Sequence, residues 1–153
     1  MASKGLSNVY IDSLLKPICK KFKGTFSCDK IPSFSKHIHF SCIINLSRHD
    51  EIGTHFIAIY YNRSKIYYFD SLNLPVENDY IISFLQKYRV PIVKNDEAYQ
   101  CDTSDFCGYY CCFYIMLAEY NTPMLTISRI FRNTTCEEND ILIIELMKYM
   151  ILL

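Results

Sequence analysis

Residues Ala98 to Cys111 read AYQCDTSDFCGYYC, and the rest of the chain is organised around them. The stretch begins as a polar loop and continues into an apolar run, Tyr109–Tyr120, which contains no Gly or Pro and therefore predicts a buried helix. Any of the polar residues 103–105 can cap that helix, which places Cys107 in its first turn. Unpaired backbone N–H groups and the helix dipole favour the thiolate there, and the thiolate is the nucleophilic form of cysteine.

Gln100 lies seven residues before Cys107. From that position its side-chain amide can return across the loop and donate a hydrogen bond to an oxygen held beside the sulfur. Together with the backbone N–H of Cys107 it would form an oxyanion hole. The alternative is a buried helix in which Cys107 is only a small hydrophobic residue, and that interpretation suits a cysteine with no base nearby.

A base is available upstream, at His55. This histidine begins an apolar segment, Thr54–Tyr61, which is typical of a central strand, and Asn62–Lys65 predicts a hairpin into a second strand that ends at Asp70. The start of one antiparallel strand lies beside the end of the next, so the two side chains can meet. Asp70 would fix the imidazole tautomer, and the other ring nitrogen would face the thiol.

The other three histidines are weaker candidates for the base. His37 and His39 alternate along one face of a predicted strand, and His49 lies in a polar turn. A different class of function, a zinc module, would draw on Cys101, Cys107, Cys111, Cys112, His37 and His39. We do not favour it, because the chain has no Cys-x-x-Cys pair and Cys111 and Cys112 point to different faces of the helix.

Composition limits the remaining possibilities. The length of 153 residues predicts one domain, residues 1–153, and half of the residues are hydrophobic. The 16 basic and 16 acidic residues give a net charge of zero, which argues against a strongly basic nucleic-acid binder. We find no secretory signal and no membrane-spanning run, so we expect a chain that is not secreted, with all eight cysteines as reduced thiols.

Hydrophobic periodicity and the positions of Gly, Pro and capping residues predict several other elements. We expect a helix between Leu6 and Lys20 that ends or bends at Pro17, and a loop over 24–35. Alternation over 38–46 predicts a strand with one buried face. Further along, the sequence predicts a helix capped by Asn78 or Asp79, and a short strand at 90–94 in which Pro91 indicates either a position near the sheet edge or the start of the strand. A linker at Pro123 and a final amphipathic helix from about Asp140 follow.

The quoted stretch, with Cys107 followed by Gly108-Tyr109-Tyr110-Cys111-Cys112, resembles the nucleophile region of adenovirus-type (adenain-like) cysteine proteases. The segment Gly53-Thr54-His55-Phe56, with Asn45 ten positions before His55, is similar to their histidine region. Tyr68-Phe69-Asp70-Ser71-Leu72 resembles the acidic strand end found there and in the related SUMO/ubiquitin-like proteases. The resemblance implies an α+β fold, with a mixed central sheet packed by helices and a papain-type site in permuted order. It assigns His55 as base, Asp70 as orienting acid, Gln100 as oxyanion donor and Cys107 as nucleophile.

The sequence also departs from that family. Phe56 stands where the family usually has Trp, and Asp70 stands where adenovirus enzymes often have Glu. Adenovirus enzymes are activated by DNA and by a viral peptide that forms a disulfide with a cysteine between the acid and the Gln, but this chain has no cysteine there. We therefore expect activity without a cofactor or metal, or with a non-covalent peptide activator, and the net charge does not support DNA as a partner.

The resemblance implies a viral cysteine endopeptidase that cleaves structural (capsid or core) precursor polypeptides, after small residues such as Gly. Such an enzyme would work in the nucleus or cytoplasm of the host cell and in the virion, with no membrane partner. The alternative is a deubiquitinase- or deSUMOylase-like isopeptidase acting on host conjugates, since both would use the same site.

Overall fold

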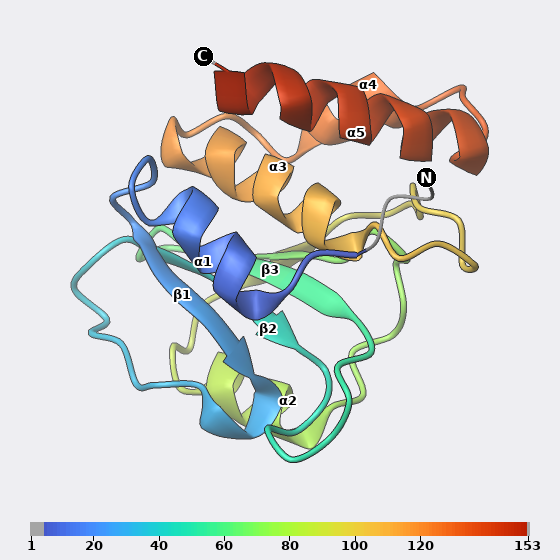
Figure 1. Cartoon of the computed structure of the whole chain (residues 1–153). Helices are drawn as coiled ribbons and strands as arrows, with labels where there is room; N and C mark the ends of the chain where they lie inside the picture. The colour runs from blue at the N-terminus through green and yellow to red at the C-terminus, as the bar shows by residue number, and fades with distance from the viewer. Residues whose placement is uncertain (1–4, 153) are drawn as a thin grey trace.

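The structure, a computed structural model, describes residues 5–152 and has a five-stranded sheet with helices on both faces (Figure 1). The helices are α1 (Asn8–Leu15), α2 (Asp79–Gln86), α3 (Cys107–Glu119), α4 (Leu125–Phe131) and α5 (Cys136–Leu152), with a short 3-10 turn at Cys28–Lys30. The strands are β1 (Phe22–Ser27), β2 (Phe40–Asn45), β3 (Phe56–Tyr61), β4 (Ile66–Phe69) and β5 (Ile92–Lys94). This arrangement confirms the expected α+β class.

The strands lie in the sheet in their sequence order, β1-β2-β3-β4-β5. The three central strands are antiparallel, whereas β1 pairs with β2 and β5 pairs with β4 in parallel. The β3–β4 pair is the predicted hairpin, and in it Ala58 lies opposite Phe69. This register places His55, just before β3, and Asp70, just after β4, at the same end of the sheet.

Two apolar cores cover the two faces of the sheet. One core contains residues of α1, α3 and α5 packed on alternate sheet residues such as Ile43, Ala58 and Phe69. The other lies between α2 and the opposite face, around Phe40 and Ile59. Helix α3 lies between the sheet and α5, which explains why its sequence is apolar on all sides.

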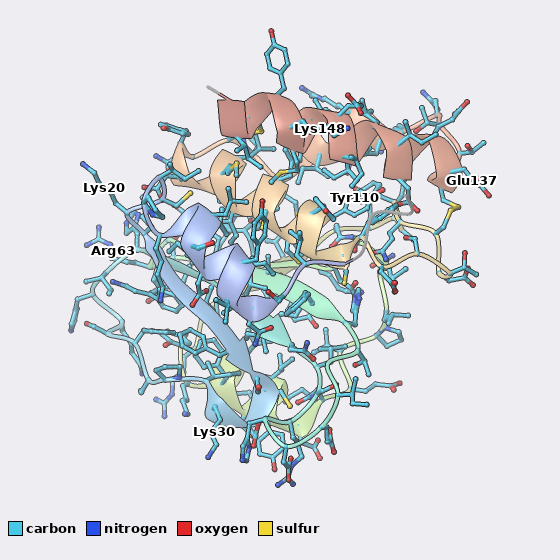
Figure 2. All side chains as sticks on the ribbon, viewed as in Figure 1. Lys20, Lys30, Arg63, Tyr110, Glu137 and Lys148 are labelled. Carbon is cyan, nitrogen blue, oxygen red and sulfur yellow. A yellow bond between two sulfur atoms is a disulfide. The ribbon has the colours of Figure 1, made fainter. Side chains whose placement is uncertain are left out.

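A buried polar contact inside that helical layer joins α3 to α5. The hydroxyl of Tyr110 donates a 2.8 Å hydrogen bond to Oδ1 of Asp140, and both side chains are buried (Figure 2 labels Tyr110 on α3). Burial raises the pKa of Tyr110, with a further contribution from Asp140, so the tyrosine stays a neutral donor. Among the described residues, no helix is both long and apolar enough to span a bilayer.

Several predicted elements are confirmed: α1 ends before Pro17, Asn78 caps α2 by accepting from the backbone N–H of Ile81, and β5 is an edge strand. The expectation of a loop over 24–35 was wrong at its start, because Thr25 and its neighbours belong to β1. Gly24 has a φ of 140°, and the β1–β2 register shifts between Phe22 and Thr25. Such an irregular strand has no alternation for a pattern to detect.

Three other expectations need correction. Strand β2 is buried on both faces, not one, because both cores reach it. The presumed linker at Pro123 leads into α4, which is only seven residues long and was not predicted. Helix α5 begins at Cys136, four residues before the predicted start. Thr135 and Glu138 form a capping box at this end: the backbone N–H of Glu138 donates to Oγ1 of Thr135, and the backbone N–H of Thr135 donates to the carboxylate of Glu138.

Candidate active site

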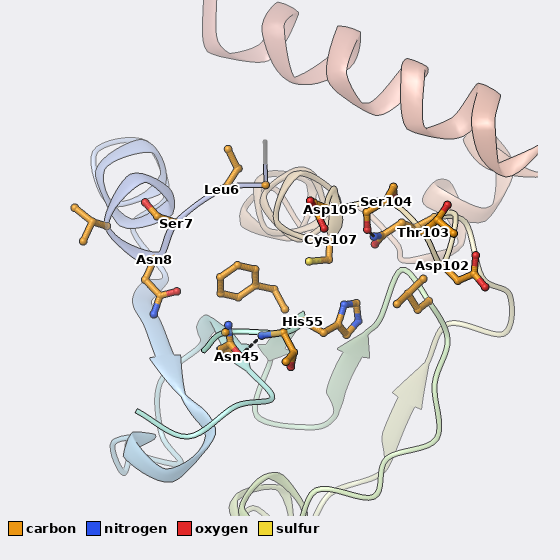
Figure 3. Close-up of a pocket in the computed structure, with 17 residues that line it drawn as sticks. Leu6, Ser7, Asn8, Asn45, His55, Asp102, Thr103, Ser104, Asp105 and Cys107 are labelled. Atoms are coloured by element: carbon orange, nitrogen blue, oxygen red, sulfur yellow. Dashed lines mark hydrogen bonds between the residues drawn. The ribbon is translucent and has the colours of Figure 1, made fainter. Parts of the chain in front are cut away.

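A pocket of about 730 Å³ opens at the end of the sheet where β3 begins and α3 starts (Figure 3). Three segments far apart in the sequence line it: residues 5–9, at the start of α1; residues around Gly53–Phe56; and the loop 100–107. His55, Gln100 and Cys107 are among the lining residues, and Figure 3 shows the sulfur of Cys107 and the ring of His55 facing the same space. The structure thus brings the predicted site residues together.

Cys107 is the first residue of α3, as the sequence predicts. Its side chain is 8% exposed, and this exposure faces the pocket. The predicted cap by one of residues 103–105 was wrong: Phe106 occupies the cap position, and no side chain caps the helix. The hydroxyl of Ser104 instead donates back to the carbonyl of Cys101. Among the described residues, the backbone N–H groups of Cys107 and Gly108 have no acceptor, whereas that of Tyr109 bonds the carbonyl of Phe106. The N–H of Cys107 therefore remains available to an oxygen in the pocket.

His55 and Asp70 form a buried pair behind the pocket. Nε2 of His55 lies 2.6 Å from Oδ1 of Asp70, and since a carboxylate only accepts, Nε2 carries the proton. His55 is 7% and Asp70 1% exposed. The carboxylate also accepts from the backbone N–H groups of Leu72 at 2.9 Å and Leu74 at 3.0 Å. With Nε2 engaged, the free ring nitrogen of His55 is Nδ1.

The charge state of His55 follows from these contacts. Burial disfavours the imidazolium, but the hydrogen bonds and charges of Asp70 and Cys107 outweigh burial and raise the pKa of His55 from 6.5 to about 9. Because the folded pKa lies above the ordinary value, the resulting stabilisation is fully present below pH 6.5. It is lost as pH rises through about 9.

This raised pKa predicts the alkaline limit of any activity that needs the His55 imidazolium. We expect kcat/KM for peptide hydrolysis to fall as pH rises above about 9, because His55 then has no proton to give a leaving amine. The measurement is a pH–rate profile from pH 5 to 10.5. In Asp70→Asn the neutral amide no longer stabilises the imidazolium, so the pKa of His55 should be lower. The kcat/KM of any residual activity should therefore begin to fall at a lower pH than in the wild type. An unchanged limb in that variant would contradict the assignment.

Asn95 fixes the position of Asp70. Its Oδ1 accepts from the backbone N–H of Asp70 at 2.8 Å, and its Nδ2 donates to the Asp70 carbonyl at 2.7 Å. The same Nδ2 donates to the carbonyl of Glu97 at 2.9 Å. Asn95 is 25 residues from Asp70 and belongs to no motif, so no signal in a single sequence identifies it.

Gln100 is buried beside the pocket, and its amide is held at both ends. Oε1 accepts from the hydroxyl of Ser71 at 2.6 Å, and Nε2 donates to the carbonyl of Ser104 at 2.8 Å. In the described part of the chain Nε2 has that one acceptor, so its second hydrogen is left for another oxygen. This arrangement is the one that the predicted oxyanion donor requires.

Asn45 and the segment before α1 also shape the pocket. Asn45 lines it, and its Oδ1 accepts from the backbone N–H of Ser47 at 2.8 Å and of Thr54 at 3.4 Å. The segment before α1 forms the opposite wall, and it approaches the Cys107 loop closely: a Cβ at Gly5 would lie 2.7 Å from the carbonyl oxygen of Asp105. Exposed Val9 also lines the pocket.

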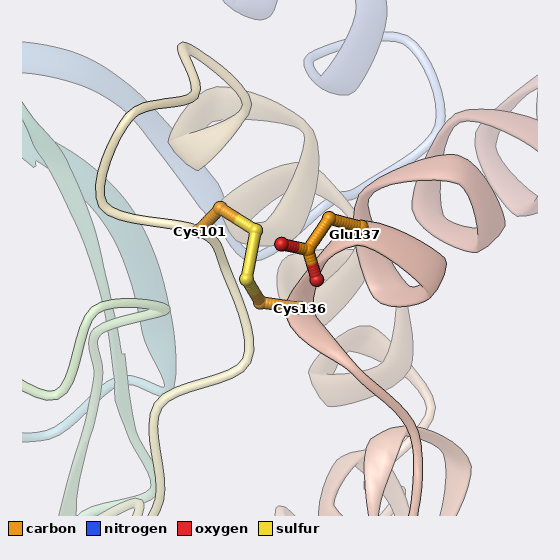
Figure 4. A group of neighbouring side chains, drawn as sticks. All are labelled: Cys101, Cys136 and Glu137. Carbon is orange, nitrogen blue, oxygen red and sulfur yellow. A yellow bond between two sulfur atoms is a disulfide. The ribbon is translucent and has the colours of Figure 1, made fainter.

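A disulfide lies beside the same loop and corrects the expectation that all eight cysteines are reduced. Cys101, directly after Gln100, is bonded to Cys136 at the start of α5, with 5.0 Å between their Cα atoms (Figure 4). The other six cysteines are free thiols. Closing a loop with a sequence separation of 35 residues lowers the entropy of the unfolded chain, which stabilises the fold by about 4 kcal/mol. The cause is tertiary proximity, which sequence spacing does not reveal.

The structure gives no support to the zinc alternative. In residues 5–152, the clusters of three donor side chains are Cys101–Cys136–Glu137 and Asp29–His49–Asp50. Neither contains Cys107, Cys111, Cys112, His37 or His39, the residues the alternative needed, and Cys101 is in a disulfide.

The sequence profile of the adenovirus endoprotease family matches residues 22–151, a range that includes His55, Asp70, Gln100 and Cys107. The chain belongs to the adenovirus endoprotease family. A search of curated proteins gave no significant match. Among solved structures, the crystal structure of the ASFV pS273R protease superposes with a TM-score of 0.63 at 20% identity, over 90% of this chain and 65% of that one. A selenomethionine form of the same protease gives a TM-score of 0.60 at 18% identity, with the same coverage.

These comparisons agree with the geometry at two levels. The family match makes the chain a member of a family of viral cysteine proteases. The superposition shows that this adenovirus endoprotease family member shares the fold of the ASFV protease, whose chain it matches over 65% of its length. The recognition made from the Cys107, His55 and Asp70 segments is therefore confirmed.

Proposed function

We propose that the chain is a cysteine endopeptidase in which Cys107 is the nucleophile, His55 the general base and acid, Asp70 the orienting acid and Gln100 the oxyanion donor. The observation that carries the proposal is the buried 2.6 Å contact between Nε2 of His55 and Asp70. That contact leaves Nδ1 as the ring nitrogen for the thiol, in a pocket that also contains Gln100 and Cys107.

The reaction follows from this arrangement. His55 takes the proton of Cys107, and the thiolate attacks the carbonyl carbon of the scissile bond, forming a C–S bond and an oxyanion. The free N–H of Gln100 and the backbone N–H of Cys107 stabilise the oxyanion. When the C–N bond breaks, His55 protonates the leaving amine and a thioester remains. Water, deprotonated by His55, then hydrolyses the thioester and restores the thiol.

We further propose that the substrates are viral structural precursors cleaved after small residues such as Gly, in the infected nucleus or cytoplasm and in the virion. Membership of the adenovirus endoprotease family supports this substrate class. The absence of cysteine between Asp70 and Gln100 supports activity without a disulfide-linked peptide, or with a peptide bound non-covalently. The zero net charge gives little long-range attraction to DNA.

The test is incubation of the purified protein with capsid and core precursors encoded in the same genome, followed by mapping of the cut sites by mass spectrometry. Parallel assays use a fluorogenic peptide with Gly before the bond, with and without DNA, under mild reduction. Cuts after small residues are expected without an activator. Rapid reaction with a ubiquitin or SUMO covalent probe and no precursor cleavage would instead indicate the isopeptidase.

Cys107 is expected to be the one rapidly alkylated thiol. It is 8% exposed and lines the pocket with His55, whereas the other five free cysteines are at most 3% exposed and do not line this pocket. Burial raises the pKa of Cys19 to about 12, and also raises the pKa of Cys42, Cys111 and Cys112. A short exposure to iodoacetamide near neutral pH, followed by peptide mapping, should find the label on Cys107. Faster labelling of Cys111 would show that the nucleophile has been assigned to the wrong residue.

A further inference from the structure

Ser71 is completely buried, and it immediately follows Asp70. Its carbonyl accepts hydrogen bonds from the backbone N–H groups of both Tyr99 at 2.8 Å and Gln100 at 3.1 Å. Its hydroxyl donates to Oε1 of Gln100 at 2.6 Å. One residue therefore holds both the backbone and the side chain of Gln100.

The orientation of the Gln100 amide is fixed by the chemistry of its two neighbours. The Ser104 carbonyl can only accept, so the group facing it must be Nε2, which donates to it at 2.8 Å. Oε1 must then face Ser71, and the single hydroxyl hydrogen of Ser71 is donated to it. In a flipped amide, Oε1 would face the Ser104 carbonyl, and two acceptors would be in contact.

We propose that Ser71 is a positioning residue for oxyanion stabilisation: its hydroxyl keeps the Gln100 amide oriented with one N–H free for the substrate oxygen. The proposal rests on the proposed function of Gln100. It also means that Asp70 and Ser71, adjacent in one turn, serve different halves of the site. Asp70 holds the imidazole, and Ser71 holds the oxyanion donor.

Two other features, the disulfide and the exposed face of α5, support no comparable inference. The disulfide at Cys101, the residue after Gln100, holds the backbone of the loop, but it donates or accepts no hydrogen bond that would select one orientation of the amide. The exposed apolar residues of α5, Ile141 and Tyr149, have nothing in the described structure that indicates a partner.

The test is a double-mutant cycle with Ser71→Ala, Gln100→Ala and the combined variant, assayed with the fluorogenic Gly peptide. Gln100→Ala is expected to lower kcat about 10²–10³-fold, as for loss of one oxyanion donor. Ser71→Ala should lower kcat about tenfold with little change in KM, since only the orientation of the donor is lost. In the Gln100→Ala background, Ser71→Ala should have no further effect on kcat. Equal losses in both backgrounds would show a purely structural role.

Two further readouts separate the proposal from general damage. A peptide aldehyde ending in glycinal places an oxygen in the oxyanion hole, so its Ki should rise in Ser71→Ala by the same factor as kcat falls. Iodoacetamide alkylation of Cys107 forms no oxyanion, so its rate should not change, and the alkaline limb set by His55 should stay in place. Slower alkylation of Cys107, or a shift in the pH at which kcat/KM falls on the alkaline side, would show that Ser71 acts on the Cys107–His55 pair. Either result would overturn the proposal.

The two proposals fail in different ways. If the wild-type protein does not cleave the peptide, the proposed function fails. If the wild type cleaves and Ser71→Ala cleaves equally well, only the role of Ser71 is refuted. Should Ser71→Ala melt below the assay temperature, Ser71→Cys replaces it in the same kcat and Ki measurements, because a thiol is a weak donor of similar size. Ser71→Cys is then expected to lower kcat, and wild-type kcat in this variant would refute the proposal.

Discussion

Cys107→Ser is expected to lower peptide hydrolysis at least about 10³-fold while the protein stays folded. The substitution keeps the size and the position at the start of α3 but replaces the thiol with a hydroxyl, whose proton is far harder to remove. The measurement is kcat/KM with the fluorogenic Gly peptide, together with thermal melting, and the melting temperature should stay close to that of the wild type.

The matched control for this prediction is Cys111→Ala, one helical turn along α3. Cys111 is fully buried in the core and does not line the pocket, so its truncation should cost some stability and leave kcat near the wild-type value. Retained hydrolysis in Cys107→Ser, or its loss in a folded Cys111→Ala protein, would overturn the choice of nucleophile.

His55→Ala is expected to have an effect of similar size, at least about 10³-fold in kcat. Without the imidazole, Cys107 loses the group that takes its proton, and the leaving amine loses its acid. The substitution also leaves the Asp70 carboxylate without its 2.6 Å partner, although two backbone N–H groups still bond it. Melting curves should accompany the kinetics, because an unpaired buried carboxylate destabilises the fold.

His49→Ala is the control for His55→Ala. His49 also pairs with an aspartate, Nδ1 lying 2.5 Å from Oδ2 of Asp29, but its side chain is half exposed and lies outside the pocket. We expect wild-type kinetics from His49→Ala, and likewise from His37→Ala and His39→Ala. A folded, fully active His55→Ala protein would show that the Cys107–His55 pair has no catalytic part.

Much of this architecture was predictable because the relevant signals are local. Strand β3 is a continuous apolar run followed by a polar turn, and these features predict the hairpin that brings His55 and Asp70 to one end of the sheet. Likewise, α3 is apolar on every side, which is expected of a helix buried between the sheet and α5. The approach of Gln100 to the pocket followed from its spacing to Cys107.

What the sequence did not reveal depends on contacts between distant segments. Asn95 holds Asp70 across 25 residues, and Ser71 holds Gln100 across 29. Buried polar residues of this kind make contacts that no periodicity encodes, since each needs only one well-placed partner. The same reason explains the cap of α3: Ser104 is a good capping residue by type, but its hydroxyl bonds Cys101 instead.

The disulfide between Cys101 and Cys136 has a practical consequence for handling the protein. The proposed mechanism needs the sulfur of Cys107 in its lowest oxidation state, whereas the cross-link next to Gln100 exists only when two other sulfurs are oxidised. The two requirements call for different redox conditions. Concentrated dithiothreitol keeps the Cys107 thiol reduced but also reduces the disulfide between Cys101 and Cys136. A dilute monothiol, at a potential between these extremes, is the condition under which the purified protein can meet both.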